Sequence, residues 1–208
     1  MNRAILITYP DKYVIEEADE LAKAAGYEPS KVLTQDYLSR ARFGVGAGKA
    51  EEVAKLVKET SADVVIFDSK LKTTQAYNLA ELCHVEVKDR EKIILEIFAK
   101  RATTSEAKLQ VQLAELEYEL PKAKNRVRMA KRGEQPGFFG LGKYEVDIYV
   151  RMMKKRVVVL KEKVREVEKR RELFRRRRDS QKFLTLALAG YTAAGKTTLF
   201  NRLTGETK

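Results

Sequence analysis

Hydrophobic residues in the first 90 positions alternate between short apolar runs and runs at helical spacing. The short runs predict four strands, at residues 4–8, 31–34, 62–67 and 84–87. Between them, apolar positions spaced by three or four residues predict helices at residues 14–25, 49–60 and 74–82, the first of them ended by Gly26. Strands that alternate with helices of this length are typical of a parallel sheet with helices on its faces, so we expect an α/β domain over residues 1–90.

From residue 89 the pattern becomes continuously helical. One stripe of leucines recurs up to Leu120, and Pro121 then predicts a kink or a break. A second helix is predicted over residues 144–178, with a heptad seam formed by Met153, Val157, Leu160, Val164, Val167 and Phe174. Residues 133–143 are too rich in glycine for regular structure. The pattern therefore predicts a long antiparallel helical hairpin over residues 91–180, with residues 133–143 as its tip loop.

An apolar run at 183–189 predicts a strand, and a helical pattern follows at 198–203. Between them lies Gly-x-x-x-x-Gly-Lys-Thr, the spacing of a phosphate-binding P-loop in its required strand–loop–helix context. Lys196 is the candidate catalytic group, which would reach the β- and γ-phosphates, and the Thr197 hydroxyl would ligate Mg²⁺. The candidate nucleotide-binding residues are Gly190, Tyr191, Thr192, Ala193, Ala194, Gly195, Lys196, Thr197 and Thr198.

The P-loop does not by itself choose between ATP and GTP. The sequence motifs that normally follow it in a GTPase, Asp-x-x-Gly and Asn-Lys-x-Asp, do not occur in residues 1–208. We therefore interpret residues 181–208 as the first strand, P-loop and helix of a truncated nucleotide-binding domain.

Charge is distributed unevenly along the chain. Residues 1–120 carry 17 Lys+Arg and 21 Asp+Glu, a net of 17 − 21 = −4, whereas residues 121–182 carry 22 and 8, a net of 22 − 8 = +14. A localised basic excess indicates either a surface that binds a polyanion or a solvated helical hairpin. Aromatic residues in the tip loop favour RNA, because rings stack on unpaired bases, although the rings could instead cap the hairpin core. The candidate RNA-binding residues are Arg126, Arg128, Lys131, Arg132, Phe138, Phe139 and Lys143.

Several other classes of site have little support. A single cysteine, Cys83, excludes an intrachain disulfide and fits a reducing cytoplasm. The sequence contains no secretory signal and no apolar stretch long enough to span a membrane. Glycines 44, 46 and 48 before Lys49 do not have P-loop spacing, so a conformational role is the better interpretation. We expect a monomer.

An ordered series of motifs resembles the HflX family of ribosome-associated GTPases over essentially the whole chain. The matching stretches are Val65–Asp68, Gln75 with Asn78-Leu79, Asp89-Arg90, Ile97–Ala99 with Arg101-Ala102, Lys108–Ala114, Gly190–Thr192, Ala194–Lys196 and Thr198–Asn201. The resemblance implies an N-terminal α/β domain, a helical hairpin and a GTPase domain. It also implies binding of GTP and GDP with Mg²⁺, and association with the large ribosomal subunit and its RNA, with possible ribosome splitting.

The chain departs from the family pattern at two places. Ala193 stands where the family usually has an asparagine that helps to coordinate a monovalent cation, and residues 137–146 replace a usual Arg-Gly-Pro-Gly-Glu-Thr run. Two other functions stay open on sequence grounds. The protein could be a non-catalytic RNA- or ribosome-binding protein with a vestigial P-loop, or an ATPase.

Overall fold

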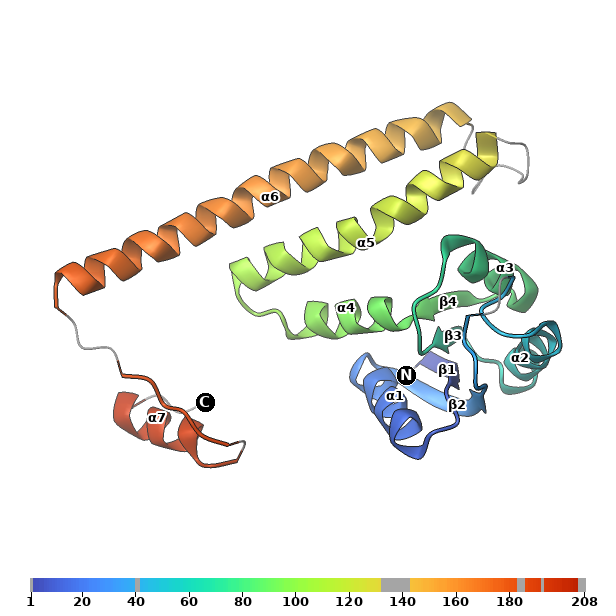
Figure 1. Cartoon of the computed structure of the whole chain (residues 1–208), viewed down its shortest axis with the longest axis horizontal. Coiled ribbons are helices and arrows are strands. Elements are labelled where there is room, and N and C mark those ends of the chain that lie inside the picture. The colour runs from blue at the N-terminus through green and yellow to red at the C-terminus, as the bar shows by residue number, and fades with distance from the viewer. Residues whose placement is uncertain (1, 40–41, 132–142, 183–185, 192, 206–208) are drawn as a thin grey trace. The chain divides into compact units, whose positions relative to one another are not determined.

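The computed structural model describes residues 2–39, 42–131, 143–182, 186–191 and 193–205, with the backbone alone for 125–131 and 143–147 (Figure 1). The chain divides into two compact units, residues 1–165 and 166–208. The first unit contains an α/β domain and most of a helical hairpin, and the second contains the P-loop segment.

Four strands form one parallel sheet in the order β2-β1-β3-β4. They are β1 (Asn2–Thr8), β2 (Tyr27–Thr34), β3 (Val64–Phe67) and β4 (Glu86–Asp89). Edge strand β2 begins four residues earlier than predicted and includes Pro29, which an edge position tolerates because its missing N–H is not needed by an inner neighbour. Strand β4 begins two residues later than predicted, because His84 ends the preceding helix in the left-handed conformation at φ 57°.

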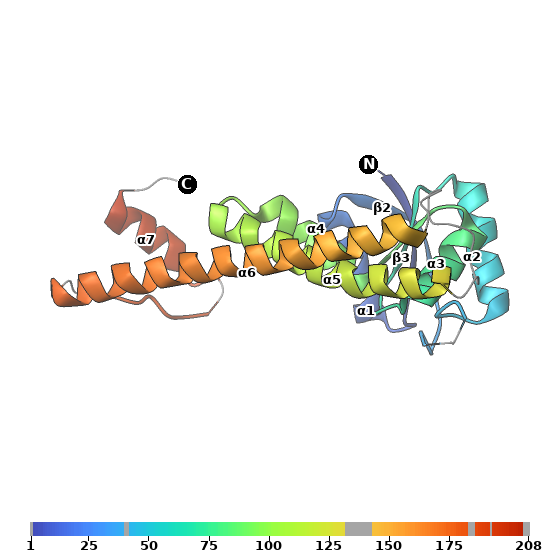
Figure 2. The same ribbon diagram turned by 90° about the horizontal axis from the view of Figure 1, so that it is seen from above.

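Helices cover both faces of this sheet, as the alternating pattern predicted (Figures 1 and 2). One face packs against α1 (Lys12–Ala24) and α4 (Arg90–Arg101), and the other against α2 (Ala47–Thr60) and α3 (Thr73–Cys83). Strand side chains alternate between the two cores, so Ile5 and Ile7 lie in one and Ala4 and Leu6 in the other. The predicted α/β class is confirmed.

The continuous helix expected over residues 89–120 is in fact two helices. Helix α4 ends at Arg101, and α5 (Ser105–Lys131) begins after a short turn. The turn forms because the Thr104 hydroxyl oxygen accepts a hydrogen bond from the Ala107 amide at 3.1 Å, which starts a new helix. Of the two outcomes expected at Pro121, a kink or a break, the break is wrong, because α5 continues through Pro121. Neighbouring side chains on both sides of Pro121 pack against other elements and hold the helix together.

Helices α5 and α6 (Lys143–Ser180) form the predicted antiparallel hairpin. Leu116, Leu120 and Ala123 of α5 pack against Val150 and Met153 of α6. Further from the tip, Lys161 pairs with Glu117 at 2.7 Å. Residues later in α5 therefore contact residues earlier in α6, which requires the two helices to be antiparallel. The seam is buried at Met153, Val157 and Leu160, whereas Phe174, in the second unit, is 63% exposed.

Asp89 joins the sheet to the hairpin. It is the last residue of β4 and is 2% exposed. Its carboxylate caps α4 by accepting from the Lys92 amide at 3.0 Å, and it accepts from the Leu71 amide at 3.3 Å. From α5, the Tyr118 hydroxyl donates to it at 2.6 Å and the Lys122 amine lies 3.7 Å away. One buried carboxylate therefore ties together β4, α4, the loop after β3 and α5.

The Tyr118 phenol is well suited to this position. Burial, followed by the hydrogen bond to the Asp89 carboxylate, raises the pKa of Tyr118 above its ordinary value. The raised pKa keeps the phenol protonated, and therefore a hydrogen-bond donor, at neutral pH. Lys122 supplies the positive charge that a buried carboxylate requires.

We predict that Asp89→Ala lowers the free energy of unfolding by about 3–5 kcal/mol, as expected when one partner of a buried ion pair is removed. Tyr118→Phe should cost about 1.5–3 kcal/mol, the range for hydrogen bonds to charged groups. Urea unfolding followed by circular dichroism measures both changes. The variant that carries both substitutions should lose less stability than the sum of the two single losses.

Asp11→Ala is the matched control, because Asp11 caps α1 through the Tyr13 and Val14 amides but is exposed. It should cost only about 1 kcal/mol. Equal losses for Asp11→Ala and Asp89→Ala would show that Asp89 is an ordinary helix cap rather than a joint.

Candidate nucleotide-binding site

The second unit contains the predicted P-loop followed by helix α7 (Lys196–Thr204). Gly195 precedes the helix at φ 77°, a conformation that favours glycine, and its carbonyl accepts from the Leu199 amide at 2.9 Å. The helix expected at 198–203 is confirmed and begins two residues earlier, so Lys196 and Thr197 lie in its first turn. Helix α7 ends at Gly205, also in the left-handed conformation.

The strand predicted at 183–189 is not formed in its described part. Residues 186–190 have no strand pairing, and residues 183–185 lie outside the described residues. The reason is that a strand needs a neighbour for its backbone hydrogen bonds, and none pairs with residues 186–190. Leu186 is 81% exposed and Leu188 44%, although their apolar character suits a sheet interior.

The Lys196 amine folds back onto its own loop. It donates to the Gly190 carbonyl at 2.8 Å and also to the Tyr191 carbonyl. These two hydrogen bonds keep the positive charge of Lys196 next to the loop. In a P-loop, the lysine at this position reaches the β- and γ-phosphates. The predicted catalytic group is therefore positioned by the loop backbone.

The first turn of α7 fits a phosphate. Helical geometry leaves the amides of Lys196, Thr197 and Thr198 without an intrahelical acceptor, and Gly195 has no side chain to cap them. Free amides at a helix N-terminus beside a lysine amine favour an anion. The exposed Thr197 hydroxyl lies in the same turn and is the oxygen type that Mg²⁺ accepts.

Ala193 adopts the left-handed conformation at φ 62°. This conformation is unfavourable for alanine, whereas asparagine and glycine adopt it readily. The position at which the sequence departs from its expected pattern therefore carries local backbone strain. Thr192, a further predicted residue of the loop, lies outside the described residues.

The predicted RNA contacts are described only in part. Arg126, Arg128 and Lys131 belong to α5 and Lys143 is the first residue of α6, for which the backbone alone is described. Residues 132 and 138–139, which complete the predicted set (Arg132, Phe138 and Phe139), lie outside the described residues. The described part of α6 is strongly basic, and its exposed cations include Lys154, Lys155, Arg170 and the run 175–178.

A second place for a ligand is the crevice where the strand order reverses, at the carboxyl ends of β1 and β3. Here the crevice is filled by the protein's own side chains. The buried Thr8 hydroxyl donates to Asp68 at 2.7 Å, and Arg90 donates to Asp68 at 2.7 Å and also pairs with Glu17. Asp68, Asp89 and Arg90 lie in stretches singled out from the sequence, but only the folded chain shows that Asp68 and Arg90 form a pair.

Gly44 shows the conformational role expected of the glycine-rich connection. Its φ is +81°, and a β-carbon there would lie 2.7 Å from the ring of Phe67 and 2.8 Å from Leu71. A larger residue would clash with the core beneath the loop. The close approach of backbone to core, rather than a nucleotide site, explains this glycine.

The structure assigns Cys83 to the core, where burial raises the pKa of its thiol to about 11 and keeps it unreactive. Among the described residues, no cluster of three or more His, Cys, Asp or Glu side chains could hold a metal ion. No helix in the described part of the chain is long and apolar enough to cross a membrane.

Sequence reasoning missed Tyr118 and Lys122. Both are single polar residues on a long charged helix, and nothing in their spacing distinguishes them from solvated neighbours. The available signal was Tyr118 itself, an aromatic residue on the predicted hairpin outside the leucine stripe.

Two family models match the chain in order. The first, described as GTP-binding GTPase N-terminal, matches residues 12–99, and the second, GTP-binding GTPase Middle Region, matches residues 101–178. The chain is 45% identical over 198 residues to GTPase HflX of Methanocaldococcus jannaschii, covering 95% of this chain and 48% of the relative. It is 40% identical over 194 residues to GTPase HflX of Escherichia coli, covering 91% and 45%. The chain thus spans about half the length of these relatives.

Solved structures agree with this assignment. A GTP-binding protein from Sulfolobus solfataricus in complex with GDP gives a TM-score of 0.60 at 26% identity, covering 99% of this chain and 54% of that one. A structure described as the SsGBP and GDP complex gives 0.64 at 25% identity, covering 99% and 56%. With both regions matched in order and with relatives this similar along the sequence, the chain belongs to the HflX family of GTPases.

Proposed function

We propose that this protein is a GTP-binding, GTP-hydrolysing factor that associates with the large ribosomal subunit, and that nucleotide controls its binding and release. The observation that carries the proposal is the first turn of α7, which combines free backbone amides with the Lys196 amine and the Thr197 hydroxyl. Membership of a GTPase family favours guanine over adenine nucleotides. The proposed site of action is the cytoplasm.

Phosphate binding would replace the loop carbonyls with phosphate oxygens as the acceptors for the Lys196 amine. Its amine donates to two loop carbonyls, and phosphate oxygens would replace them with charge-assisted hydrogen bonds, which are stronger than bonds to neutral carbonyls. The loop carbonyls thus keep the amine beside the loop, near its proposed target. During attack of water on the γ-phosphate, Lys196 would offset the negative charge that spreads over the phosphate oxygens.

A magnesium ion fits the same turn. Thr197 would hold it through its hydroxyl, and the metal would neutralise charge on the β- and γ-phosphates when bound. Thr198, one residue further, presents an exposed hydroxyl and a free amide. The chain's own contribution is to bind and orient the phosphates.

The hairpin is the proposed RNA-binding part. Its basic segment has a net charge of +14 against −4 for residues 1–120. Exposed lysines and arginines along α6 can meet phosphates, and the tip residues carry the proposed stacking rings. This charge and the membership of the family support the proposed association with the large subunit.

A non-catalytic RNA-binding role is the second candidate. The exposure of Leu186 and Leu188 favours it, because the P-loop lacks a supporting sheet among the described residues. Co-sedimentation with large subunits, with and without a GTP analogue, separates the two. Nucleotide-dependent binding supports the GTPase factor, and equal binding in both conditions supports the passive role.

We predict that the 208-residue chain binds GTP weakly and hydrolyses it negligibly. Residues 186–190 form no strand, so the loop amides lack the fixed frame that orients them in advance for phosphate. Isothermal titration with GTP and Mg²⁺ and a phosphate-release assay test this. Tight stoichiometric binding with turnover would show that the loop needs no neighbouring strand.

Lys196→Ala should weaken the remaining GTP affinity by roughly 10- to 150-fold, since hydrogen bonds between charged groups contribute about 1.5–3 kcal/mol. Arg202→Ala is the matched control, because it removes the same charge from the exposed part of α7. Equal losses for the two variants would indicate a non-specific charge effect instead of a P-loop contact. Titration with ATP in parallel tests the base preference.

Simultaneous replacement of Arg126, Arg128, Lys131 and Arg132 by Ala should weaken binding to large subunits and make it less dependent on salt. Each lost phosphate contact lowers the slope of log K against log salt by about 0.9, so four contacts lower it by roughly 3 to 4. The control removes four exposed lysines from the acidic domain, Lys12, Lys23, Lys55 and Lys58. An unchanged slope in the first variant would reject the proposed contacts.

A further inference from the structure

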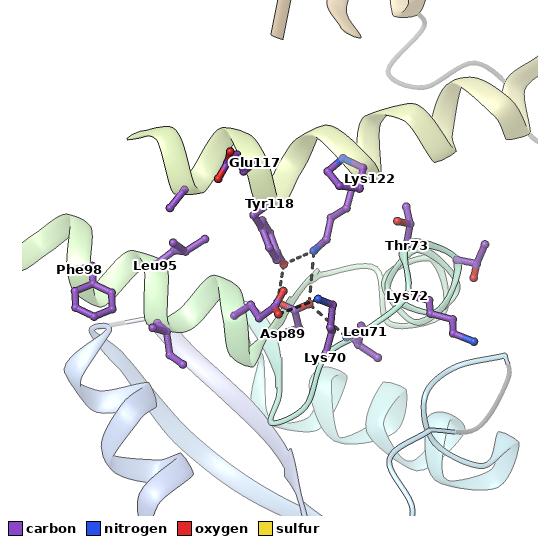
Figure 3. A pocket seen from close by; sticks show the side chains of 15 residues that line it. Lys70, Leu71, Lys72, Thr73, Asp89, Leu95, Phe98, Glu117, Tyr118 and Lys122 are labelled. Carbon is purple, nitrogen blue, oxygen red and sulfur yellow. Dashed lines mark hydrogen bonds and ion pairs between the residues drawn. The ribbon is translucent and has the colours of Figure 1, made fainter. Parts of the chain in front are cut away.

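The first unit contains an apolar groove that the nucleotide and RNA proposals leave unused. Its main part is a cavity of about 810 Å³ between α4, α5 and the loop after β3 (Figure 3). A second cavity of about 350 Å³ continues it along the same two helices and shares Leu95, Phe98 and Ala114 with the first. We call the joined cavities the α4–α5 groove.

The groove follows from two stripes on α5. One stripe, with Leu116 and Leu120, packs against α6. The other recurs at spacings of four, three and four on the side that lines the groove, through Ala107, Val111, Ala114 and Tyr118. Helix α4 contributes Ile94, Leu95 and Phe98 from its opposing face. The groove therefore lies between α4 and α5, which are linked through Asp89 but leave apolar surface uncovered along their length.

Phe98 demonstrates that this surface is uncovered. Its ring lies on the groove side of α4 and is 58% exposed. In Figure 3, Phe98 and Leu95 lie toward one end of the lining, and Tyr118 and Lys122 extend from α5 toward Asp89 near its middle. An exposed ring beside a continuous apolar lining is the type of surface that a partner protein or a ligand can cover.

The charges around the groove are not balanced. Its acidic groups are engaged: Glu91 pairs with Lys70 at 3.0 Å, and Glu117 pairs with Lys161 at 2.7 Å. Asp89 is held by Tyr118 and Lys122. Lys72 at the end formed by the β3–α3 loop, and Arg101 at the end of α4, form no ion pair within the described part of the chain.

The dimensions of the groove fit a helix. It extends along α4 from Glu91 to Arg101, roughly 15 Å or three helical turns. A third helix laid between two others places its side chains in their grooves, the usual mode of helix packing. A strand would find no free partner there, because the walls are helices whose backbone groups are already paired.

We propose that the α4–α5 groove docks an amphipathic helix of a partner protein, about three turns long, with an apolar stripe facing Phe98 and Ala114 and carboxylates at both ends. The stripe would cover the apolar lining, and the carboxylates would meet Lys72 and Arg101. This is the helix-in-groove mode of recognition, with charge complementarity selecting an acidic partner.

A direct test uses the full 208-residue chain and a labelled synthetic peptide of about 14 residues. The peptide carries leucines at i, i+3, i+4 and i+7 with glutamates in its first and last turns. Fluorescence anisotropy should show saturable binding, at least about tenfold tighter than that of a scrambled peptide of the same composition. NMR shifts on peptide addition should map to Leu95, Val111 and Ala114. Equal binding of the scrambled peptide, or shifts elsewhere, would overturn the proposal.

Two variants locate the site. Phe98→Ala should weaken peptide binding by roughly tenfold, because exposed rings are frequent anchors. Phe174→Ala, which removes a ring of similar exposure from α6, should leave it unchanged. Unchanged affinity for Phe98→Ala would overturn the proposal.

Charge reversal tests the ends of the groove. Lys72→Glu with Arg101→Glu should weaken binding of the acidic peptide by roughly fivefold, since exposed ion pairs contribute little individually. The same variant should bind a peptide with lysines at its ends more tightly. Lys55→Glu with Lys58→Glu on α2 is the control and should change neither affinity. Self-association lost in Phe98→Ala would assign the groove to a second copy, and displacement of the peptide by an RNA hairpin would assign it to RNA; each result would overturn the proposal.

Discussion

The buried carboxylate of Asp89 is the interaction on which the first unit depends. It ends β4, caps α4, holds the loop after β3 and receives the Tyr118 hydroxyl from α5. A charge at this depth is tolerable because three donors meet its oxygens and Lys122 lies close by. The joint between the sheet and the hairpin is therefore centred on one charged residue, and the α4–α5 groove forms beside it.

The sheet has the topology of many ligand-binding α/β domains, but its own side chains fill the usual crevice. Thr8, Asp68 and Arg90 form a partly buried network at the carboxyl ends of β1 and β3. That network stabilises the sheet edge and leaves little polar surface for a nucleotide. In this chain the phosphate-binding features are instead found in the Gly190–Thr197 loop and α7, in the second unit.

Helix α5 illustrates how one element serves several contacts. Its leucines face α6, its smaller apolar residues face the groove, and Tyr118 and Lys122 reach the joint between them. Packing on several sides explains why the helix continues through Pro121, since tertiary contacts compensate for the backbone hydrogen bond that proline removes. The groove is the side of α5 on which apolar lining stays uncovered in the described side chains.

The sequence by itself determined the α/β class, the antiparallel hairpin and the position of the P-loop helix, because periodicity and glycine spacing are local properties. It also predicted a conformational role for Gly44. Only the tertiary structure decided that Asp89 meets Tyr118, that Asp68 pairs with Arg90, and that α4 and α5 are separate helices. It also showed that residues 186–190 form no strand. These features depend on which distant residues come together, and a strand, an ion pair or a groove needs a neighbour that the local pattern does not specify.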